Sequence, residues 1–587
     1  MPDTEVVMQP PSLSRLRIGR TLLRDLLQFH PRIFAIAVGG ASVYAVCTVA
    51  SSFGVAYLVD EVILPRFEKG KIDIGVYLTG AVIVICIGLL RAFGVVIRRS
   101  FAGISNWRTV ESLSMLLVKH IMTQPLFWHK KKMTGDLVAR VGVDSDAAAE
   151  VLGPLPFSTS VVLLVFLTGG WLVIVDVPLG LVAISVIPIL LLLNVGYQRR
   201  IDKHYDTAQH ELGALSSAVH ESFDGVMVVK AFGAEERETR RLSVISTRLK
   251  DARIRAVSAR STFEALLDGV PSLVNILLLV IGAMRVESKN MSVGELTSFI
   301  YLFTLLIFPL RIIGYVLSSV PHSASGYKRV REILDEPVAL DPQTMILKSS
   351  VELGVRLEGI TFRFGDELPD VLKNITLEIA AGKTVVVVGA TGSGKSTLLS
   401  VMAGLLQPDK GTVWIANRSA SIVFQEPFLF SGTIRHNINM GRSITDNVLQ
   451  KSLYLAGADG FVGALEEGVN TVIGERGISL SGGQRQRISL ARAIAQESSV
   501  LLLDDTTSAL DTITESIVID RLRGSENIIT TIIVASRPST IALADEVIFI
   551  ENGKLSDQGS HPDLLMRSGN YRLLMQSFEH DRDQGGL

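Results

Sequence analysis

The chain has 587 residues, with 57 basic and 58 acidic side chains that give a formal net charge of −1. That length predicts more than one domain, and the charge balance gives no support for nucleic-acid binding. Two cysteines, Cys47 and Cys86, lie in apolar runs, which argues against a disulfide framework and a cysteine metal site. Hydrophobic residues make up 48 % of the chain and the mean hydropathy is +0.38. The composition therefore predicts membrane-spanning segments.

The N-terminal segment, residues 1–31, is predicted to lie on the cytoplasmic face of a membrane. From about Leu13 to Phe29 arginines are interspersed with leucines, which is typical of a basic amphipathic helix. An ordinary solvated helix is the alternative, and the apolar segment that follows at once favours the membrane surface. We expect no removable signal sequence, because residues 1–12 are polar and rich in proline.

Residues 32–325 are predicted to form a transmembrane domain of six helices. Six apolar segments each reach the roughly 20 residues needed to cross a hydrocarbon core. They lie at about 33–63, 75–97, 152–175, 178–198, 263–284 and 294–320. The long connections after the second and fourth segments are rich in Lys and Arg, so both termini and these connections should be cytoplasmic.

The two long connections have helical patterns and should extend the spans into the cytoplasm. Each contains a turn, at Met133–Asp136 and at Phe223–Gly225, that presents a short helix to a cytosolic domain; a plain helical hairpin is the alternative. A charge at the bilayer centre costs about 3 kcal/mol on insertion scales, so polar residues in the spans should face the bundle interior, pair, or lie near an interface. These residues are Arg91, Glu264, Asp268, Asn275 and Arg311. Glu264 and Asp268 share a helix face, which fits either a polar substrate path or local ion pairs.

Beyond a predicted linker at 326–350, short β runs alternate with helices, which predicts an α/β domain at 351–578 and a solvated tail at 579–587. A glycine-rich stretch follows the β-branched run Thr384–Val388 and precedes a helix. It contains Gly389, Ala390, Thr391, Gly392, Ser393, Gly394, Lys395, Ser396 and Thr397. Strand, glycine-rich turn and helix are the setting of a P-loop, whose backbone N–H groups bind phosphate. We predict that Lys395 reaches the β- and γ-phosphates of a nucleotide and that Ser396 holds Mg²⁺.

Further segments accompany the P-loop in a characteristic order. Phe364 is placed to stack on adenine, and Gln425 follows a predicted strand, where it can reach Mg²⁺ and the attacking water. Asp504 ends a buried strand and suits Mg²⁺. The remaining segments are Ser481, Gly482, Gly483 and Gln484, which open a helix, and Ser508–Asp511. The N-terminus of that helix suits a γ-phosphate, and a second copy of the domain could supply it in trans.

Together, Gly389–Thr397, Phe424–Pro427, Leu480–Gln484, Leu501–Asp505 and Ser508–Asp511 resemble the motif set of ATP-binding cassette (ABC) transporters. The resemblance covers nearly the whole chain and is to an exporter-type half-transporter. It implies a membrane α-helical bundle, six transmembrane helices with long cytoplasmic extensions, followed by an α/β P-loop cassette domain. It also implies ATP and Mg²⁺ as cofactors, an inner-membrane location with the cassette in the cytoplasm, and a dimer. Each ATP would lie between the P-loop of one cassette and Ser481–Gln484 of the other, and the two stalk turns resemble coupling helices.

Two residues depart from that family pattern. Asp505 stands where the family carries a Glu general base, and Ser536 stands where it carries a His that contacts the γ-phosphate. An Asp carboxylate is one methylene shorter, roughly 1.5 Å, and a misplacement of about 1 Å can cost on the order of 100-fold in rate. The chain between Gly411 and Gln425 is also shorter than usual. It resembles the first cassette of the multidrug-resistance-associated and cystic-fibrosis-channel subfamily, whose own ATP site is typically degenerate.

These departures predict an ATPase-coupled translocase that is one half of a heterodimer. Its own ATP site would have reduced hydrolytic competence, and Ser481–Gln484 would complete the site of a catalytically competent partner half-transporter. A homodimeric exporter with slow hydrolysis based on Asp505 is an alternative, as is an ATP-gated regulatory, channel-like or importing subunit. The transported substrate is not specified by any residue of the sequence.

Overall fold

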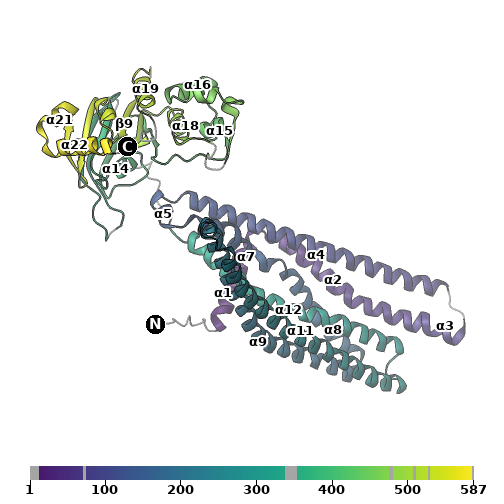
Figure 1. Ribbon diagram of the computed structural model, residues 1–587. Helices are drawn as coiled ribbons and strands as arrows, with labels where there is room; N and C mark the ends of the chain where they lie inside the picture. Colours follow the sequence, from purple (N-terminus) through teal and green to yellow (C-terminus); the bar gives the residue numbers. More distant parts are fainter. Residues whose placement is uncertain are drawn as a thin grey trace. The chain divides into compact units, whose positions relative to one another are not determined.

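The computed structural model describes residues 12–70, 74–337, 353–365, 367–474, 477, 480–506, 511–525 and 529–584. The chain divides into two compact units. Unit 1 comprises Met1–Met122 and Thr134–Pro337, and unit 2 comprises Thr123–Met133 and Val338–Leu587. Unit 1 is helical, whereas unit 2 contains the β-sheets (Figure 1). The predicted fold class, a membrane helical bundle followed by an α/β cassette domain, is confirmed.

Unit 1 is built from long helices that run side by side (Figure 1), and short helices lie between some of them in the chain. They are α1 (Ser12–Phe29), α2 (Pro31–Tyr57), α3 (Leu64–Lys69), α4 (Ile74–Met122), α6 (Thr134–Ala139), α7 (Ser145–Ala149), α8 (Leu155–Val175), α9 (Val177–Asp224), α10 (Val226–Ala231), α11 (Glu235–Glu287) and α12 (Val293–Leu334). Irregular helical turns lie at Leu58–Ile63, Arg140–Asp144 and Glu150–Leu152. Among the described side chains of the first helix, Leu22 and Leu26 are buried while Arg24 is exposed; the location of this helix on a membrane surface stays a prediction.

Four helical stretches of the described chain are long and apolar enough to cross a membrane. They are Pro31–Phe67, Ile74–Met122, Thr134–Val175 and Glu235–Glu287. The described apolar parts of α9 and α12 are shorter, Val177–Ile189 and Val293–Ile307. The number of six spans therefore stays a prediction.

Small residues bring α2 and α4 of unit 1 into close contact. A Cβ built on Gly40 would lie 2.8 Å from the backbone N of Arg98, and one built on Gly94 would lie 3.0 Å from the carbonyl O of Gly40. Neither position therefore has room for a side chain without a shift of the two helices. Elsewhere in the unit, the apolar core includes Leu172, Leu179 and Leu278.

Two of the polar residues predicted within the spans have local partners. Arg260 Nε donates to Glu264 Oε1 at 2.8 Å, which supports the ion-pair interpretation of Glu264. Asn275 Nδ2 donates to Thr304 Oγ1 at 3.1 Å. The side chains of Asp268 and Arg311 lie outside the described residues.

Two of the predicted boundaries shift, that of the linker after unit 1 and that of the C-terminal tail. Arg98 is the first residue of the predicted connection after the second segment; it lies inside α4, as a helical extension of the span predicts, and is only 7 % exposed. Helix α12 continues to Leu334, so the first part of the predicted linker is helical, because no glycine or proline follows Gly326 before Pro337. The rest of that linker, residues 338–350, lies outside the described residues. Helix α22 likewise continues through most of the predicted tail, to Gln584.

The main sheet of unit 2 has six strands in the order β11-β10-β3-β9-β8-β5. Their bounds are β11 (Lys554–Gly559), β10 (Glu546–Glu551), β3 (Thr384–Val388), β9 (Thr530–Val534), β8 (Val500–Asp504) and β5 (Ala420–Val423). All neighbouring pairs are parallel except β10 and β11. Strands β3, β8 and β9 are buried at every position, as expected for a parallel sheet covered on both faces.

Smaller elements complete unit 2. An antiparallel sheet has the order β2-β1-β4, with β1 (Leu353–Phe362), β2 (Leu372–Ala380) and β4 (Lys410–Ile415), and the short strands β6 (Gly432–Thr433) and β7 (Val472–Ile473) form an antiparallel pair. The helices are α5 (Leu126–Lys131), α14 (Lys395–Met402), α15 (Ile434–Asn439), α16 (Asp446–Leu455), α17 (Asp459–Gly463), α18 (Gly482–Ile494), α19 (Thr512–Arg523), α20 (Pro538–Ala542), α21 (His561–Arg567) and α22 (Gly569–Gln584), with 3-10 turns at Ala416–Arg418 and Gly468–Asn470.

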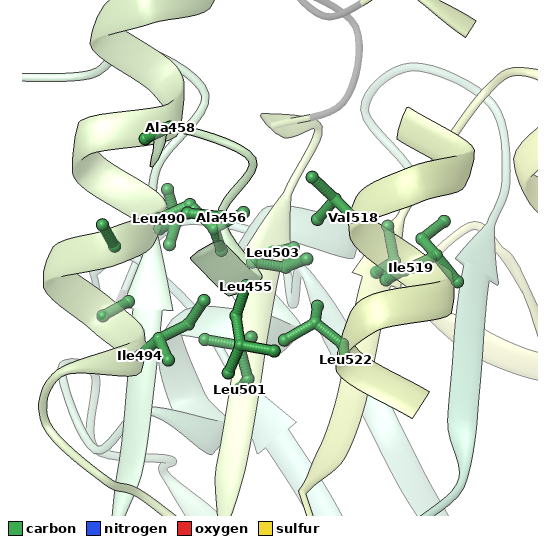
Figure 2. Packing of buried hydrophobic residues seen from close by; sticks show 14 of the residues in the cluster. Leu455, Ala456, Ala458, Leu490, Ile494, Leu501, Leu503, Val518, Ile519 and Leu522 are labelled. Carbon is green, nitrogen blue, oxygen red and sulfur yellow. The ribbon is translucent and has the colours of Figure 1, made fainter. Parts of the chain in front are cut away.

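Strand β8 lies between two hydrophobic clusters, because its side chains point alternately to the two faces of the sheet. Leu501 and Leu503 pack with α16, α18 and α19, whereas Leu502 packs in the second cluster with α14. The residues of the first cluster labelled in Figure 2 are Leu455, Ala456, Ala458, Leu490, Ile494, Leu501, Leu503, Val518, Ile519 and Leu522. Because side chains alternate along a strand, Asp504 points to the same face as Leu502, toward α14.

Candidate functional site

Four of the predicted site segments lie at the carboxyl ends of neighbouring parallel strands. The P-loop follows β3, Gln425 follows β5, Asp504 ends β8 and Ser536 follows β9. Since β3, β9, β8 and β5 are adjacent in that order, their carboxyl ends meet at one edge of the sheet. Ligands of open α/β sheets bind at this edge. The topology therefore brings together segments that lie far apart in the sequence.

The P-loop has a backbone that only glycine adopts easily and an outer face that is open. Gly392 and Gly394 have φ values of 82° and 101°, and Gly394 caps the start of α14. A Cβ on Gly392 would meet nothing within 4 Å, which leaves room for a ligand against the loop. The Ser393 hydroxyl is buried and has no hydrogen-bond partner among the described atoms. Of the other loop residues, Ala390, Thr391 and Ser396 are exposed, and Thr397 is half-buried.

Lys395 lies folded over the P-loop. Its Nζ donates to the carbonyl oxygens of Gly389 at 2.8 Å and Ala390 at 3.0 Å. Burial lowers the pKa of Lys395, and the negative charges of Asp505 and Asp504 act in the opposite direction. The ammonium group therefore lies beside the open loop, where the phosphates of a nucleotide would offer it charged acceptors.

Gly389→Ala is expected to destabilise the nucleotide-free protein by about 3 kcal/mol. A Cβ at this position would lie 2.3 Å from the carbonyl O of Ile550 and 2.7 Å from Ser393 Oγ, and a backbone carbonyl cannot move aside cheaply. The matched control is Gly392→Ala, which meets only the left-handed backbone cost of about 1 kcal/mol. Thermal unfolding of both variants measures the difference, and equal losses would contradict the steric account.

Two of the three predicted metal ligands, Ser396 and Asp504, lie within hydrogen-bond distance of each other, whereas the third, Gln425, contacts Asp505. Ser396 Oγ donates to Asp504 Oδ1 at 2.8 Å. Burial raises the pKa of Asp504, while Ser396 and Lys395 act to lower it. A hydroxyl and a carboxylate are hard oxygen ligands of the kind that Mg²⁺ takes together with substrate phosphates. Ser396 and Asp504 therefore fit Mg·ATP, and a bound Mg²⁺ would neutralise charge on the phosphates.

Asp505 has a backbone conformation that is rare outside glycine. Its φ is 49°, in the left-handed region where Asp and Asn are enriched over other residues. Gln425 Nε2 donates to Asp505 Oδ2 at 3.1 Å. Burial raises the pKa of Asp505, and the neighbouring charge of Asp504 raises it further. The structure thus brings the predicted general-base position and Gln425 into direct contact.

Ser536 is exposed immediately beyond β9. The adjacent Arg537 forms an ion pair in which its Nη1 lies 3.3 Å from Glu515 Oε2. Glu515 is 1 % exposed and also accepts a hydrogen bond from Thr540. These contacts tie the segment after β9 to α19. Ser536 places a small hydroxyl at the position where the family pattern has a His side chain.

The predicted signature residues form the N-terminus of α18. Ser481 Oγ accepts from Gln484 N at 3.3 Å, and Gln484 Oε1 accepts from Ser481 N at 2.9 Å, which is a capping box. Gly482 is exposed, and a Cβ there would meet nothing within 4 Å; Gly483 follows it in the first turn. This helix end therefore presents its backbone outward. Ser508–Leu510 lie outside the described residues.

Three aromatic and amide contacts around the site involve residues that the sequence did not single out. The ring of Phe364 is stacked 5.9 Å from the ring of Phe127 on α5, and it meets Phe362 edge-on at 5.0 Å. The role of Phe364 toward adenine stays a prediction. Gln486, 1 % exposed, donates through Nε2 to the carbonyl O of Phe424 at 3.3 Å and so ties α18 to the residue before Gln425. The sequence gives no sign that Gln486 is buried, because polar residues in helices are mostly exposed.

Comparison with known proteins agrees with this geometry. Residues 41–310 match the family model of the ABC transporter transmembrane region, and residues 372–508 match that of the ABC transporter. The chain is 30 % identical over 78 % of its length to the probable multidrug resistance ABC transporter ATP-binding/permease protein YheI of Bacillus subtilis (strain 168), of which it covers 80 %. It is 28 % identical over 86 % of its length to the ATP-dependent lipid A-core flippase of Shigella flexneri, of which it covers 89 %.

A solved structure shares the fold. The structure of a bacterial Atm1-family ABC exporter with ATP bound matches 93 % of this chain and 99 % of its own chain, with a TM-score of 0.74 and 23 % sequence identity. The fold, the P-loop geometry and the sequence relatives point to one conclusion. The chain belongs to the ABC transporter family of ATPase-coupled translocases, as a half-transporter with its transmembrane domain before its ATP-binding cassette.

Proposed function

We propose that this chain is one half of a heterodimeric ABC exporter whose own site binds Mg·ATP and hydrolyses it slowly. The observation that carries the proposal is the pair of residues at the base and switch positions, Asp505 and Ser536. Its partner would be an unlike half-transporter with an intact Glu and His at these positions. The two halves would lie in the inner membrane with both termini and both cassettes in the cytoplasm.

The conformation of Asp505 supports slow hydrolysis at this site. A left-handed φ of 49° favours Asp over the longer Glu, and the 3.1 Å hydrogen bond from Gln425 engages the carboxylate oxygen Oδ2. A general base must reach the proton that it abstracts. A shorter carboxylate that is held by a neighbouring amide is poorly placed to do so.

The surroundings of Ser536 support the same conclusion. A serine hydroxyl lacks the reach and the positive charge of an imidazolium. The nearest cation in sequence, Arg537, is engaged with the buried Glu515 at 3.3 Å. The cation of this segment is therefore paired with Glu515, and Ser536 itself offers the γ-phosphate of ATP no positive charge.

The short connection before Gln425 is consistent with the subfamily resemblance. Strand β4 ends at Ile415 and β5 begins at Ala420, with a 3-10 turn at Ala416–Arg418 between them. Asn417 in this turn has a φ of 50°. The connection between these strands is therefore short, in keeping with the resemblance to that subfamily.

The signature helix would serve the partner rather than this chain. The capping box fixes the N-terminus of α18, and the exposed Gly482 leaves its backbone accessible. The first turn of a helix binds phosphate through its N–H groups and its dipole.

The turn predicted at Phe223–Gly225 leads into α10. Met227 of this helix is 78 % exposed, and Phe232, which follows the helix, is 77 % exposed. These apolar side chains support a docking role for α10 on a cassette.

The proposal is tested by ATP turnover of the purified chain with and without its partner. We expect slow turnover by the lone chain and rapid turnover by the pair. Ser481→Arg in this chain should remove most turnover of the pair, because it blocks the partner's ATP site, whereas Ser443→Arg at an exposed position should leave it unchanged. Rapid turnover by the lone chain would overturn the heterodimer and favour a homodimer.

A further inference from the structure

Arg98 is a buried cation of α4 that the ATP site does not use. The residue is 7 % exposed, and its Nη1 has neither solvent contact nor a hydrogen-bond partner among the described residues. Its Cζ lies 4.4 Å from the ring centroid of Phe157 and 4.8 Å from that of Tyr44. Aromatic faces stabilise a cation, but they leave the in-plane N–H donors of a guanidinium without acceptors.

A second cation lies on the same face of α4. Arg91 precedes Arg98 by seven residues, about two helical turns, and its Cζ lies 5.4 Å from the same Tyr44 ring. The close contact of Gly40 and Gly94 holds α2 and α4 together between the two arginines. Tyr44, Phe157 and Arg91 are each only partly buried, so they form a half-open rim around Arg98.

The opposite face of α4 has a different character. Between residues 82 and 96 this face carries exposed apolar side chains that recur every three or four residues: Val82, Ile85, Leu89, Phe93 and Val96. By helical phase this stripe lies across the helix from Arg91 and Arg98. The two arginines are therefore directed away from the apolar surface and into the bundle. Ionisable residues so placed mark substrate paths in membrane proteins.

We infer that Arg98, with Arg91 and Tyr44, binds the anionic headgroup of an amphiphilic substrate. A phosphate or carboxylate would accept a hydrogen bond from Nη1 of Arg98. Two of its oxygens would then accept parallel hydrogen bonds from the guanidinium plane. Because apolar side chains of α4 lie beside the arginines, a ligand that contacts both would carry an apolar body together with its anionic group. The inference rests on the proposed transport function and names its substrate class.

The test is binding of radiolabelled dodecyl phosphate to the full-length protein in phosphatidylcholine nanodiscs. Arg98→Gln should weaken binding by about 10-fold, equal to about 1.4 kcal/mol. Arg99→Gln, the adjacent and exposed arginine, removes the same charge and should change binding by less than about twofold. Arg98→Lys keeps the charge without the planar fork and should fall between wild type and Arg98→Gln. Equal affinities of Arg98→Gln and Arg99→Gln would overturn the inference.

Competing ligands identify the chemistry and the source. Dodecyltrimethylammonium should not displace the probe, and displacement by it would overturn the anionic assignment. Phosphatidic acid in the disc should compete if a membrane lipid is the ligand; failure to compete, with dodecanoate still competing, assigns a soluble amphiphile. Inorganic phosphate that competes as well as dodecyl phosphate would refute the need for an apolar body.

ATP binding measured in the same discs separates this inference from the proposed function. Amphiphile binding is measured without nucleotide, so it can fail while the ATP site is intact, and the reverse also holds. Thermal unfolding of Arg98→Gln and the wild type in the same discs shows whether the variant is folded, because ATP binding reports only on unit 2. If that variant does not fold, the comparison of Arg98→Lys with Arg99→Lys decides the question, and equal affinities again overturn the inference.

Discussion

Asp505→Glu combined with Ser536→His is expected to raise ATP turnover of the lone chain by about 100-fold. The longer carboxylate gains roughly 1.5 Å of reach, and a placement error of about 1 Å is worth on the order of 100-fold in rate. The imidazole restores a group that can contact the γ-phosphate. In a lone-chain dimer each ATP would meet an intact Ser481–Gln484 segment. The double variant therefore changes only the general base and the side chain that contacts the γ-phosphate. Turnover is measured with purified protein in nanodiscs.

The single variants serve as controls for this experiment. Asp505→Glu or Ser536→His alone should give a smaller gain, because residues that act as a unit are not additive. Glu at a left-handed φ is less favourable than Asp, so unfolding temperatures should be followed alongside turnover. A double variant that is folded, binds ATP and remains as slow as the wild type would contradict the account of Asp505 and Ser536.

The parts of the site that were predictable from the sequence are local. The P-loop is a continuous strand, turn and helix, so its residues follow from a single stretch of chain. The contact of Gln425 with Asp505 is not local, because it depends on the pairing of β5 with β8. The order of the motifs indicates both residues, but only the sheet order shows that they meet. The φ of Asp505 could not be predicted from the sequence, because Asp is only enriched in the left-handed region and does not require it.

Helix phase explains what sequence reasoning missed in unit 1. Arg98 and Arg99 end an apolar segment, which is typical of arginines that reach toward water at a membrane surface. Which of two adjacent arginines is buried depends on the face that α4 turns to α2, and that face is set by the contact of Gly40 and Gly94. The sequence places both arginines at the start of the predicted connection, and only the structure shows that Arg98 is buried while Arg99 is exposed.

Asp504→Asn is expected to weaken Mg²⁺-dependent ATP binding by about 100-fold, since loss of a group that supports a metal costs on that scale. It should also stabilise the nucleotide-free protein by about 1 kcal/mol. Burial raises the pKa of Asp504 above its unfolded value of 3.8, so the folded state binds more protons in the window between the two values. Wild-type stability therefore falls as pH rises through that window and stays lower at neutral pH.

An asparagine at position 504 avoids this cost, because its side-chain oxygen still accepts from Ser396 while the buried charge is gone. Unfolding temperatures at pH 5 and pH 8, with and without Mg·ATP, test both effects. The wild type should gain stability from Mg·ATP and the variant should not, whereas Glu466→Gln, which removes an exposed carboxylate, should behave as wild type. If Asp504→Asn lowered the stability of the nucleotide-free protein, the buried carboxylate would be a structural ligand of Ser396, and its assignment to Mg²⁺ would lose its support.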